Sequence, residues 1–73
     1  MKVFLPTRVQ QLRKENMWTQ HELAEKLNLS RSAIASWETG RREPDLRTML
    51  KLASLFHVSL DYLVGFEKAQ GRV

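Results

Sequence analysis

The chain has 73 residues, of which 12 are lysine or arginine and 8 are aspartate or glutamate, so its formal net charge is +4. This length suits one small domain with a modest core and excludes a large active-site cavity. The absence of cysteine excludes disulfides and thiolate zinc sites, and no apolar run approaches the roughly 20 residues of a membrane span. Because residues 1–6 are also too short for a signal peptide, we expect a soluble, cytoplasmic protein.

The first predicted helix spans Pro6–Glu15. Proline is well placed in a first helical turn, where its missing N–H costs nothing. Three apolar residues then repeat at helical spacing: Leu5, Val9 and Leu12. The next two residues, Asn16 and Met17, must turn the chain. Either Asn16 adopts the left-handed backbone conformation or Met17 is strained in it, and the sequence leaves both alternatives open.

The second predicted helix begins at about Thr19 and ends near Asn28. Thr19 followed three residues later by Glu22 is the pattern of a capping box, in which each residue satisfies a backbone N–H of the other. Asn28 is one of the few non-glycine residues that tolerate the left-handed conformation at a helix end.

The third predicted helix spans about Arg31 to Thr39, because Ser30 is a natural N-cap and Gly40 a natural residue just past the end. A rotation of about 100° per residue divides this helix into two arcs. The apolar arc carries Ala33, Ile34, Trp37 and Glu38. The opposite arc carries Arg31, Ser32, Ala35, Ser36 and Thr39. This arc presents a guanidinium, three hydroxyls and a methyl group, which suit a contact surface and suit an ordinary solvated face equally well.

A polar loop with two arginines separates this helix from a fourth, predicted over about Asp45 to Phe56. The predicted core stripe of the fourth helix consists of Leu46, Met49, Leu50, Ala53 and Phe56, with Leu52 at its edge. His57 is expected to act as a cap or as a partner of the helix dipole.

Ser59 begins a short fifth helix, which ends at Gly65 and closes the core. Leu55, Tyr62 and Phe66 exceed what so small a core can hold, so we expect some exposed apolar surface near the C-terminus. Residues 66–73 show no periodicity and are expected to form a flexible tail.

Several motifs at fixed spacing resemble the helix-turn-helix of the phage-repressor and Cro-like family, also called XRE-type. They are Thr19-Gln20, Glu22-Leu23-Ala24, Asn28, Ser30 to Ile34, Trp37-Glu38 and Gly40. The resemblance extends without gaps from Leu5 to Gly65. It implies an all-α, compact five-helix, lambda-repressor-like domain over residues 1–73, with its core in 5–65. The chain departs from the family at Met17 and His57, where glycine is common.

The resemblance also implies roles for individual residues. The third helix would enter the major groove, with Arg31 reading guanine, Ser32 and Ser36 contacting base edges, and Ala35 meeting a thymine methyl group. Phosphate contacts are expected from Gln20, Ser30, Arg41 and Arg42, and from His21 unless it is only an exposed side chain. Because Glu38 lies on the apolar arc and needs a cation, the family pattern pairs it with Arg13.

We therefore expect a sequence-specific regulator of transcription that binds double-stranded DNA, of the phage or mobile-element repressor type. It would act as a homodimer on a pseudo-palindromic operator, joined near the fifth helix and the C-terminus, with a regulatory protein partner as a further option. The net positive charge agrees with a polyanionic partner. The alternative is a protein-binding module, such as an antitoxin or a scaffold, that uses the same third-helix face.

We expect no cofactor, no metal and no catalytic residues. His21, Ser30 and Asp45 could be assembled into a triad on paper, but each occupies a helix-start position and little chain remains for a substrate pocket.

Overall fold

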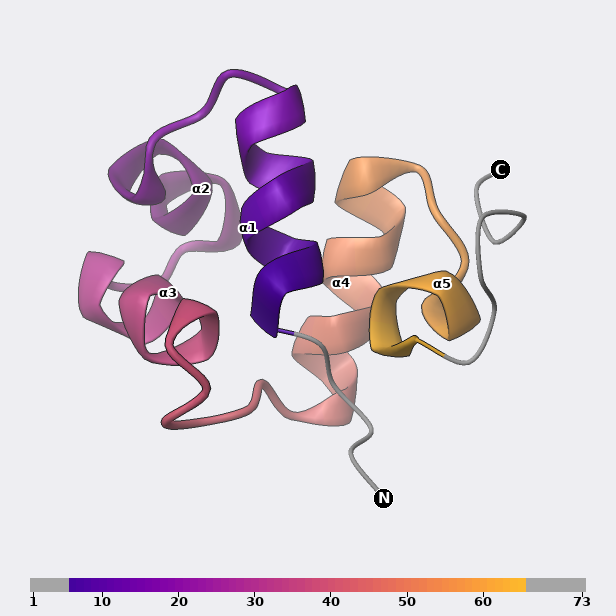
Figure 1. The fold of residues 1–73 in the computed structure, drawn as a ribbon. Helices are drawn as coiled ribbons and strands as arrows, with labels where there is room; N and C mark the ends of the chain where they lie inside the picture. Colours follow the sequence, from indigo (N-terminus) through magenta and orange to yellow (C-terminus); the bar gives the residue numbers. More distant parts are fainter. Residues whose placement is uncertain (1–5, 66–73) are drawn as a thin grey trace.

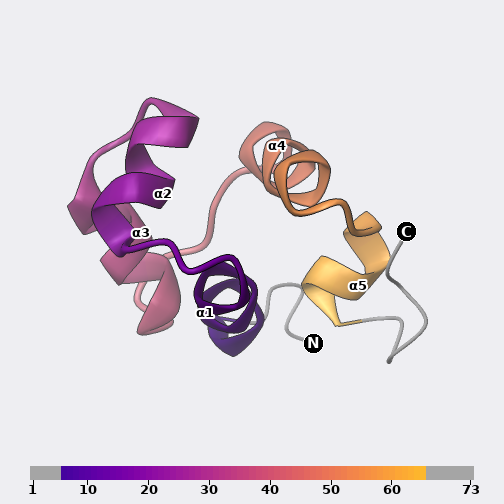
Figure 2. The same ribbon diagram turned by 90° about the horizontal axis from the view of Figure 1, so that it is seen from above.

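The computed structural model describes residues 6–65, and within this range it has five α-helices and no strand. The helices are α1 (Pro6–Glu15), α2 (Gln20–Leu27), α3 (Arg31–Glu38), α4 (Leu46–Phe56) and α5 (Leu60–Val64). Figures 1 and 2 show α2 and α3 together on one side of α1 and α5 on the other, while α4 contacts both α2 and α5. The predicted all-α fold is confirmed, and the predicted tail at residues 66–73 lies outside the described residues.

The helix starts are fixed by side-chain caps that the sequence predicts. Thr19 accepts a hydrogen bond from the N–H of Glu22 at 3.0 Å, and the Glu22 carboxylate accepts one from the N–H of Thr19 at 2.8 Å. Ser30, Asp45 and Ser59 accept comparable hydrogen bonds at the starts of α3, α4 and α5. The hydrogen bonds from Thr48 lower the pKa of the Asp45 carboxyl, since they favour its charged form.

In the connection between α1 and α2, the sequence left open whether Asn16 or Met17 adopts the left-handed conformation. Met17 has a φ of +60°, so the strained left-handed residue is Met17 and not Asn16. Asn16 instead donates its side-chain amide to the carbonyl of Leu12 at 2.8 Å. The Met17 side chain is 89% exposed, so it has little packing to offset the strain. His57 also has a positive φ, of +57°, and caps α4 as expected.

The core lies between α1 and the other helices, and its five largest fully buried side chains come one from each helix. They are Val9, Leu23, Ile34, Leu52 and Leu63. Trp18, from the connection before α2, stacks on Phe56 of α4 with ring centroids 5.7 Å apart. The aromatic pair thus ties α4 to the α1–α2 connection.

The predicted stripe of α4 is wrong in part. Leu46 is 62% exposed and Leu50 is 51% exposed, whereas Leu52, placed at the edge of the stripe, is fully buried. The apolar residues of α4 cover more than half of its circumference, so periodicity fits two neighbouring faces almost equally well. Packing against α2 and α5 selects the face centred on Leu52, Ala53 and Phe56.

The expected exposed apolar surface near the C-terminus is also wrong for Tyr62, which is only 6% exposed. The guanidinium of Arg8 lies 4.0 Å from the centroid of its ring and donates to the Tyr62 carbonyl at 2.7 Å. Leu55 is partly buried, and Phe66 lies outside the described residues. Each helix of residues 6–65 is too short or too polar to cross a membrane.

Replacing Met17 by glycine should stabilise the protein. Because glycine adopts a positive φ without strain, the substitution removes a strain of about 1–2 kcal/mol. Glycine also makes the unfolded chain more flexible, which lowers the free energy of unfolding by about 0.5–1 kcal/mol. We expect a net gain of about 0.5–1 kcal/mol in the free energy of unfolding, measured by urea denaturation. Met17→Ala keeps the strain and should give no gain, while Lys14→Gly, within α1, should lose about 1 kcal/mol. Equal gains for glycine and alanine would contradict the strain argument.

Candidate nucleic-acid interface

The orientation of α3 follows from the residues that it buries. Ile34 and Trp37 point into the core, and α3 packs against α2 and α1. The turn before α3 is short, because Asn28 ends α2 in the left-handed conformation and Ser30 already caps α3. The arc of α3 opposite Ile34 and Trp37 is therefore turned outward.

The outward arc of α3 lines a surface hollow of about 180 Å³. Its lining residues are Arg31, Ser32, Ala35, Ser36, Thr39 and Arg41. The four residues predicted to read bases thus share one surface, which we call the α3 hollow. Thr39 belongs to the same arc, and its hydroxyl donates to the Ala35 carbonyl at 3.1 Å or the Ser36 carbonyl at 3.2 Å. The reading of bases by this surface remains a prediction.

The two adjacent arginines after α3 diverge. Gly40, with a φ of +78°, turns the chain so that the N–H groups of Arg41 and Arg42 both donate to the Ser36 carbonyl, at 2.9 and 3.3 Å. Arg41 lines the α3 hollow, whereas Arg42 lines a larger hollow of about 390 Å³ between α3 and the start of α4. The two arginines therefore line different but adjoining hollows, which share Ser32 and Ser36.

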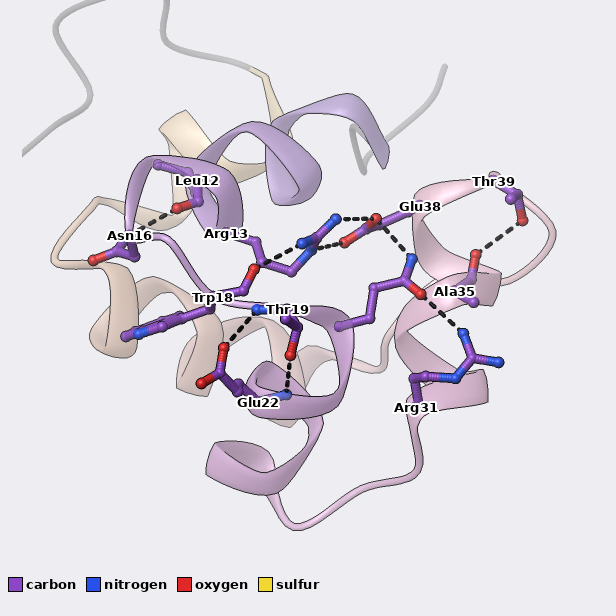
Figure 3. A network of polar contacts seen from close by, with 11 residues as sticks. Leu12, Arg13, Asn16, Trp18, Thr19, Glu22, Arg31, Ala35, Glu38 and Thr39 are labelled. Carbon is purple, nitrogen blue, oxygen red and sulfur yellow. Dashed lines mark hydrogen bonds and ion pairs between the residues drawn. The ribbon is translucent and has the colours of Figure 1, made fainter.

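A buried ion pair connects α1 with the end of α3. Arg13 donates from Nε to one oxygen of Glu38 at 2.7 Å and from Nη2 to the other at 3.0 Å (Figure 3). Its Nη1 donates to the Trp18 carbonyl at 2.7 Å. The Glu38 side chain is only 3% exposed. The pair expected from the resemblance is present, and the hydrogen bonds to the Glu38 carboxylate raise the pKa of Arg13.

The sequence does not predict the contacts made by Gln20. Its Nε2 donates to Glu38 at 3.0 Å, and its Oε1 accepts from Nη1 of Arg31 at 3.0 Å. Gln20 lies 18 residues from Glu38, so no local pattern could indicate the contact. Both polar groups of its amide are thus engaged within the protein, and its predicted phosphate contact is untested.

The remaining predicted phosphate contacts lie at helix starts. Ser30 caps α3, and its hydroxyl lies 3.1 Å from that of Ser32. His21, in the first turn of α2, is exposed and lies 3.4 Å from the carboxylate of Glu25. Ser30 and Asp45 both act as helix caps, as the sequence predicts for these two members of the triad that was assembled on paper.

Comparisons with known proteins agree with this geometry. A family model described as helix-turn-helix matches residues 9–63. The chain is 43% identical over 61 residues to the HTH-type transcriptional regulator ImmR of Bacillus subtilis (strain 168), covering 84% of the chain and 48% of that protein. It is 42% identical over 60 residues to the immunity repressor protein of Bacillus phage phi105, covering 82% of the chain and 42% of that protein.

A solved structure is also similar. The crystal structure of a transcriptional regulator from Listeria innocua matches with a TM-score of 0.80 and 33% sequence identity, covering 86% of the chain and 59% of that structure. The chain spans about half the length of the two curated relatives.

Replacing Arg13 by methionine should destabilise the protein strongly. Breaking a buried ion pair leaves the other charge unpaired, so we expect a loss of about 3–5 kcal/mol in the free energy of unfolding, measured by urea denaturation. Lys14→Met changes an exposed neighbouring cation and should stay within about 0.5 kcal/mol.

The double variant Arg13→Met with Glu38→Met leaves no unpaired buried charge and should therefore lose less than the single variant. An unchanged unfolding midpoint for Arg13→Met would show that the pair does not constrain the fold.

Proposed function

Because the chain belongs to the helix-turn-helix family, we propose that it is a sequence-specific, double-stranded DNA-binding regulator of transcription. The observation that carries the proposal is the α3 hollow, where Arg31, Ser32, Ala35 and Ser36 share one outward surface. The names of the matched relatives, which are transcriptional regulators and an immunity repressor, support it. The proposal concerns this chain as a part of a regulator, because the chain spans about half the length of the two curated relatives.

The proposed binding mode places α3 in the major groove, with α2 across the DNA backbone. The groove is about 12 Å wide and admits one helix, and the short side chains of the arc allow α3 to approach the bases closely. Arg31 would donate to the O6 and N7 atoms of a guanine. Ser32 and Ser36 would bond to base edges, and Ala35 would contact a thymine methyl group.

Phosphate contacts would position α3 without reading sequence. The candidates lie at the starts of α2 and α3 and in the loop after α3, and one of them, Arg41, lines the α3 hollow. They are Gln20, His21, Ser30, Arg41 and Arg42. The starts of α2 and α3 add unpaired backbone N–H groups that favour anions.

We further propose a repressor of phage or mobile-element type that binds a pseudo-palindromic operator as a homodimer. One such module buries too little surface for tight binding, and two-fold half-sites about one helical turn apart would double it. The similarity to a phage immunity repressor supports the repressor role. The proposed dimer contact lies at α5 and the C-terminal region. A regulator that acts on DNA would also be found in the cytoplasm of a prokaryote.

The alternative is a protein-binding module that presents the α3 hollow to an acidic partner, as an antitoxin or a scaffold would. This reading uses the same arginines, Arg31 and Arg41, but requires no duplex. The match of residues 9–63 to the helix-turn-helix family favours DNA. Salt-dependent binding to duplexes separates the two readings, because counterion release is a property of the nucleic acid.

Selection of bound duplexes from a random pool tests the proposal. We expect a palindrome to be enriched, and its affinity to fall with salt by about 0.9 logarithmic units per logarithmic unit of salt for each phosphate that an arginine or lysine neutralises. A scrambled duplex of equal length serves as the control. Equal, weak binding to both duplexes would contradict sequence-specific binding and favour the protein partner.

Replacing Arg31 by alanine should weaken binding to the selected duplex by about 1–3 kcal/mol and leave binding to the scrambled duplex nearly unchanged. The reason is that a base contact contributes only where the guanine is present. Arg47→Ala removes an exposed arginine of α4 that does not line the α3 hollow, so it should not distinguish the two duplexes. An equal loss on both duplexes for Arg31→Ala would make Arg31 a phosphate contact.

A further inference from the structure

We propose that the hydroxyl of Ser30 fixes the hydrogen-bond polarity with which Ser32 reads a base. On DNA, Ser32 accepts a hydrogen bond from an exocyclic amino group, either N6 of adenine or N4 of cytosine, and has no proton to donate. Ser30 is then a positioning residue for recognition of that base. The inference rests on the proposed function, because it requires a phosphate at Ser30 and a base at Ser32.

The two hydroxyls lie close together at the start of α3. The Ser30 oxygen is 3.1 Å from the Ser32 oxygen, so one of the two hydroxyls donates to the other. The Ser30 oxygen also accepts a hydrogen bond from the N–H of Ala33 at 3.3 Å, as the N-cap of α3. Both serines are exposed, so a bound duplex can reach both hydroxyls.

The two hollows beside α3 divide these serines between phosphate and base. Of the two, Ser30 lines only the larger hollow of about 390 Å³, where Arg42 supplies a cation for a phosphate. Ser32 lines both this hollow and the α3 hollow, which carries the proposed base-reading side chains. The hydrogen bond between the serines therefore connects a phosphate contact with a base contact.

A count of protons and lone pairs fixes the direction of this hydrogen bond on DNA. A serine hydroxyl donates one hydrogen bond and accepts at most two. A phosphate oxygen only accepts, and hydrogen bonds to a charged acceptor are stronger than neutral ones, so the Ser30 proton goes to the phosphate. The Ser30 oxygen then accepts from Ala33 and from Ser32. The proton of Ser32 is thus engaged, and only its lone pairs face the base.

A group that only accepts discriminates between base edges in the major groove. Adenine N6 and cytosine N4 are donors there, whereas guanine O6 and N7 and thymine O4 are acceptors. A serine with a free proton contacts either kind of edge. Because one net hydrogen bond changes affinity by about two- to tenfold, Ser32 should favour the amino group by about that factor.

The first test uses the base pair at which Ser32→Ala loses its preference. The preference is the ratio of the affinity for the selected duplex to that for a duplex with this base pair reversed, which puts an acceptor where the amino group was. A base analogue that lacks only the amino group, such as purine in place of adenine, should weaken wild-type binding about two- to tenfold and leave Ser32→Ala unaffected. Wild-type affinity that does not change with the analogue, or an unaltered preference in Ser32→Ala, would overturn the inference.

Variants of Ser30 separate its effect on Ser32 from its role as a cap. Ser30→Gly removes the hydroxyl but begins a helix nearly as well as serine does. The Ser32 proton is then free to donate, so the preference should fall about two- to tenfold. Ser30→Thr keeps a hydroxyl and should keep the preference. Ser54→Gly makes the same chemical change on the exposed side of α4, away from both hollows, and should also keep it.

A plain phosphate contact by Ser30 gives a different result. Ser30→Gly would then weaken binding to every duplex equally and keep the base preference, which contradicts the inference. In the Ser32→Ala background, Ser30→Gly should have no effect on the preference, because Ser30 acts through Ser32.

Failure of the inference and failure of the proposed function are distinguishable. A selected palindrome for wild type, with an unchanged base preference in Ser30→Gly, overturns only the positioning role of Ser30. The lack of any selected duplex for wild type overturns the proposed function, and the positioning role with it.

Discussion

The buried ion pair between Arg13 and Glu38 is the constraint on which the rest of the structure depends. Both charges lie almost out of reach of water, and such burial is costly unless every donor and acceptor is paired. Arg13 donates two hydrogen bonds to the Glu38 carboxylate and a third to the Trp18 carbonyl. The Gln20 amide donates a further hydrogen bond to Glu38. Because these groups come from α1, from the connection after it, from α2 and from α3, satisfying one carboxylate sets the relative positions of three helices. The outward arc of α3 is a consequence of that arrangement.

The elements that sequence reasoning predicts well are those decided by neighbouring residues. A capping box needs only Thr19 and Glu22, three positions apart, and the ends of the helices agree with the expected ones to within one residue. The buried face of α4 could not be predicted in the same way. Its apolar residues surround most of the helix, so local spacing does not distinguish Leu50 from Leu52, and only packing against α2 and α5 does. The conformation of Met17 was undecided for a related reason, since its strain is outweighed by contacts elsewhere in the fold.

The same distinction between local patterns and long-range contacts applies to the candidate site. The outward arc of α3 follows from helical periodicity, and the residues placed on it do line one hollow. The hydrogen bonds that connect Arg13 with Glu38, Glu38 with Gln20, and Gln20 with Arg31 span 25, 18 and 11 positions of the chain. Helix caps and apolar stripes give no signal for contacts so far apart in the chain, and of these contacts the family resemblance implies only the one between Arg13 and Glu38. The sequence therefore predicts which side chains face outward, while the structure is needed to say which of them are held and by what.

The two arginines of this hydrogen-bond network, Arg13 and Arg31, differ in how many of their nitrogen groups are bonded within the protein. Arg13 has all three of its nitrogen groups engaged within the protein, so its role is confined to fixing the fold. Arg31 makes its contact through one nitrogen and lies at the surface. An arginine without any restraint would lose much of its freedom on meeting DNA, and one as fully bonded as Arg13 would have no edge left to offer. The Gln20 amide lies between the two arginines, because it donates to Glu38 and accepts from Nη1 of Arg31, so Arg31 has an intermediate degree of restraint.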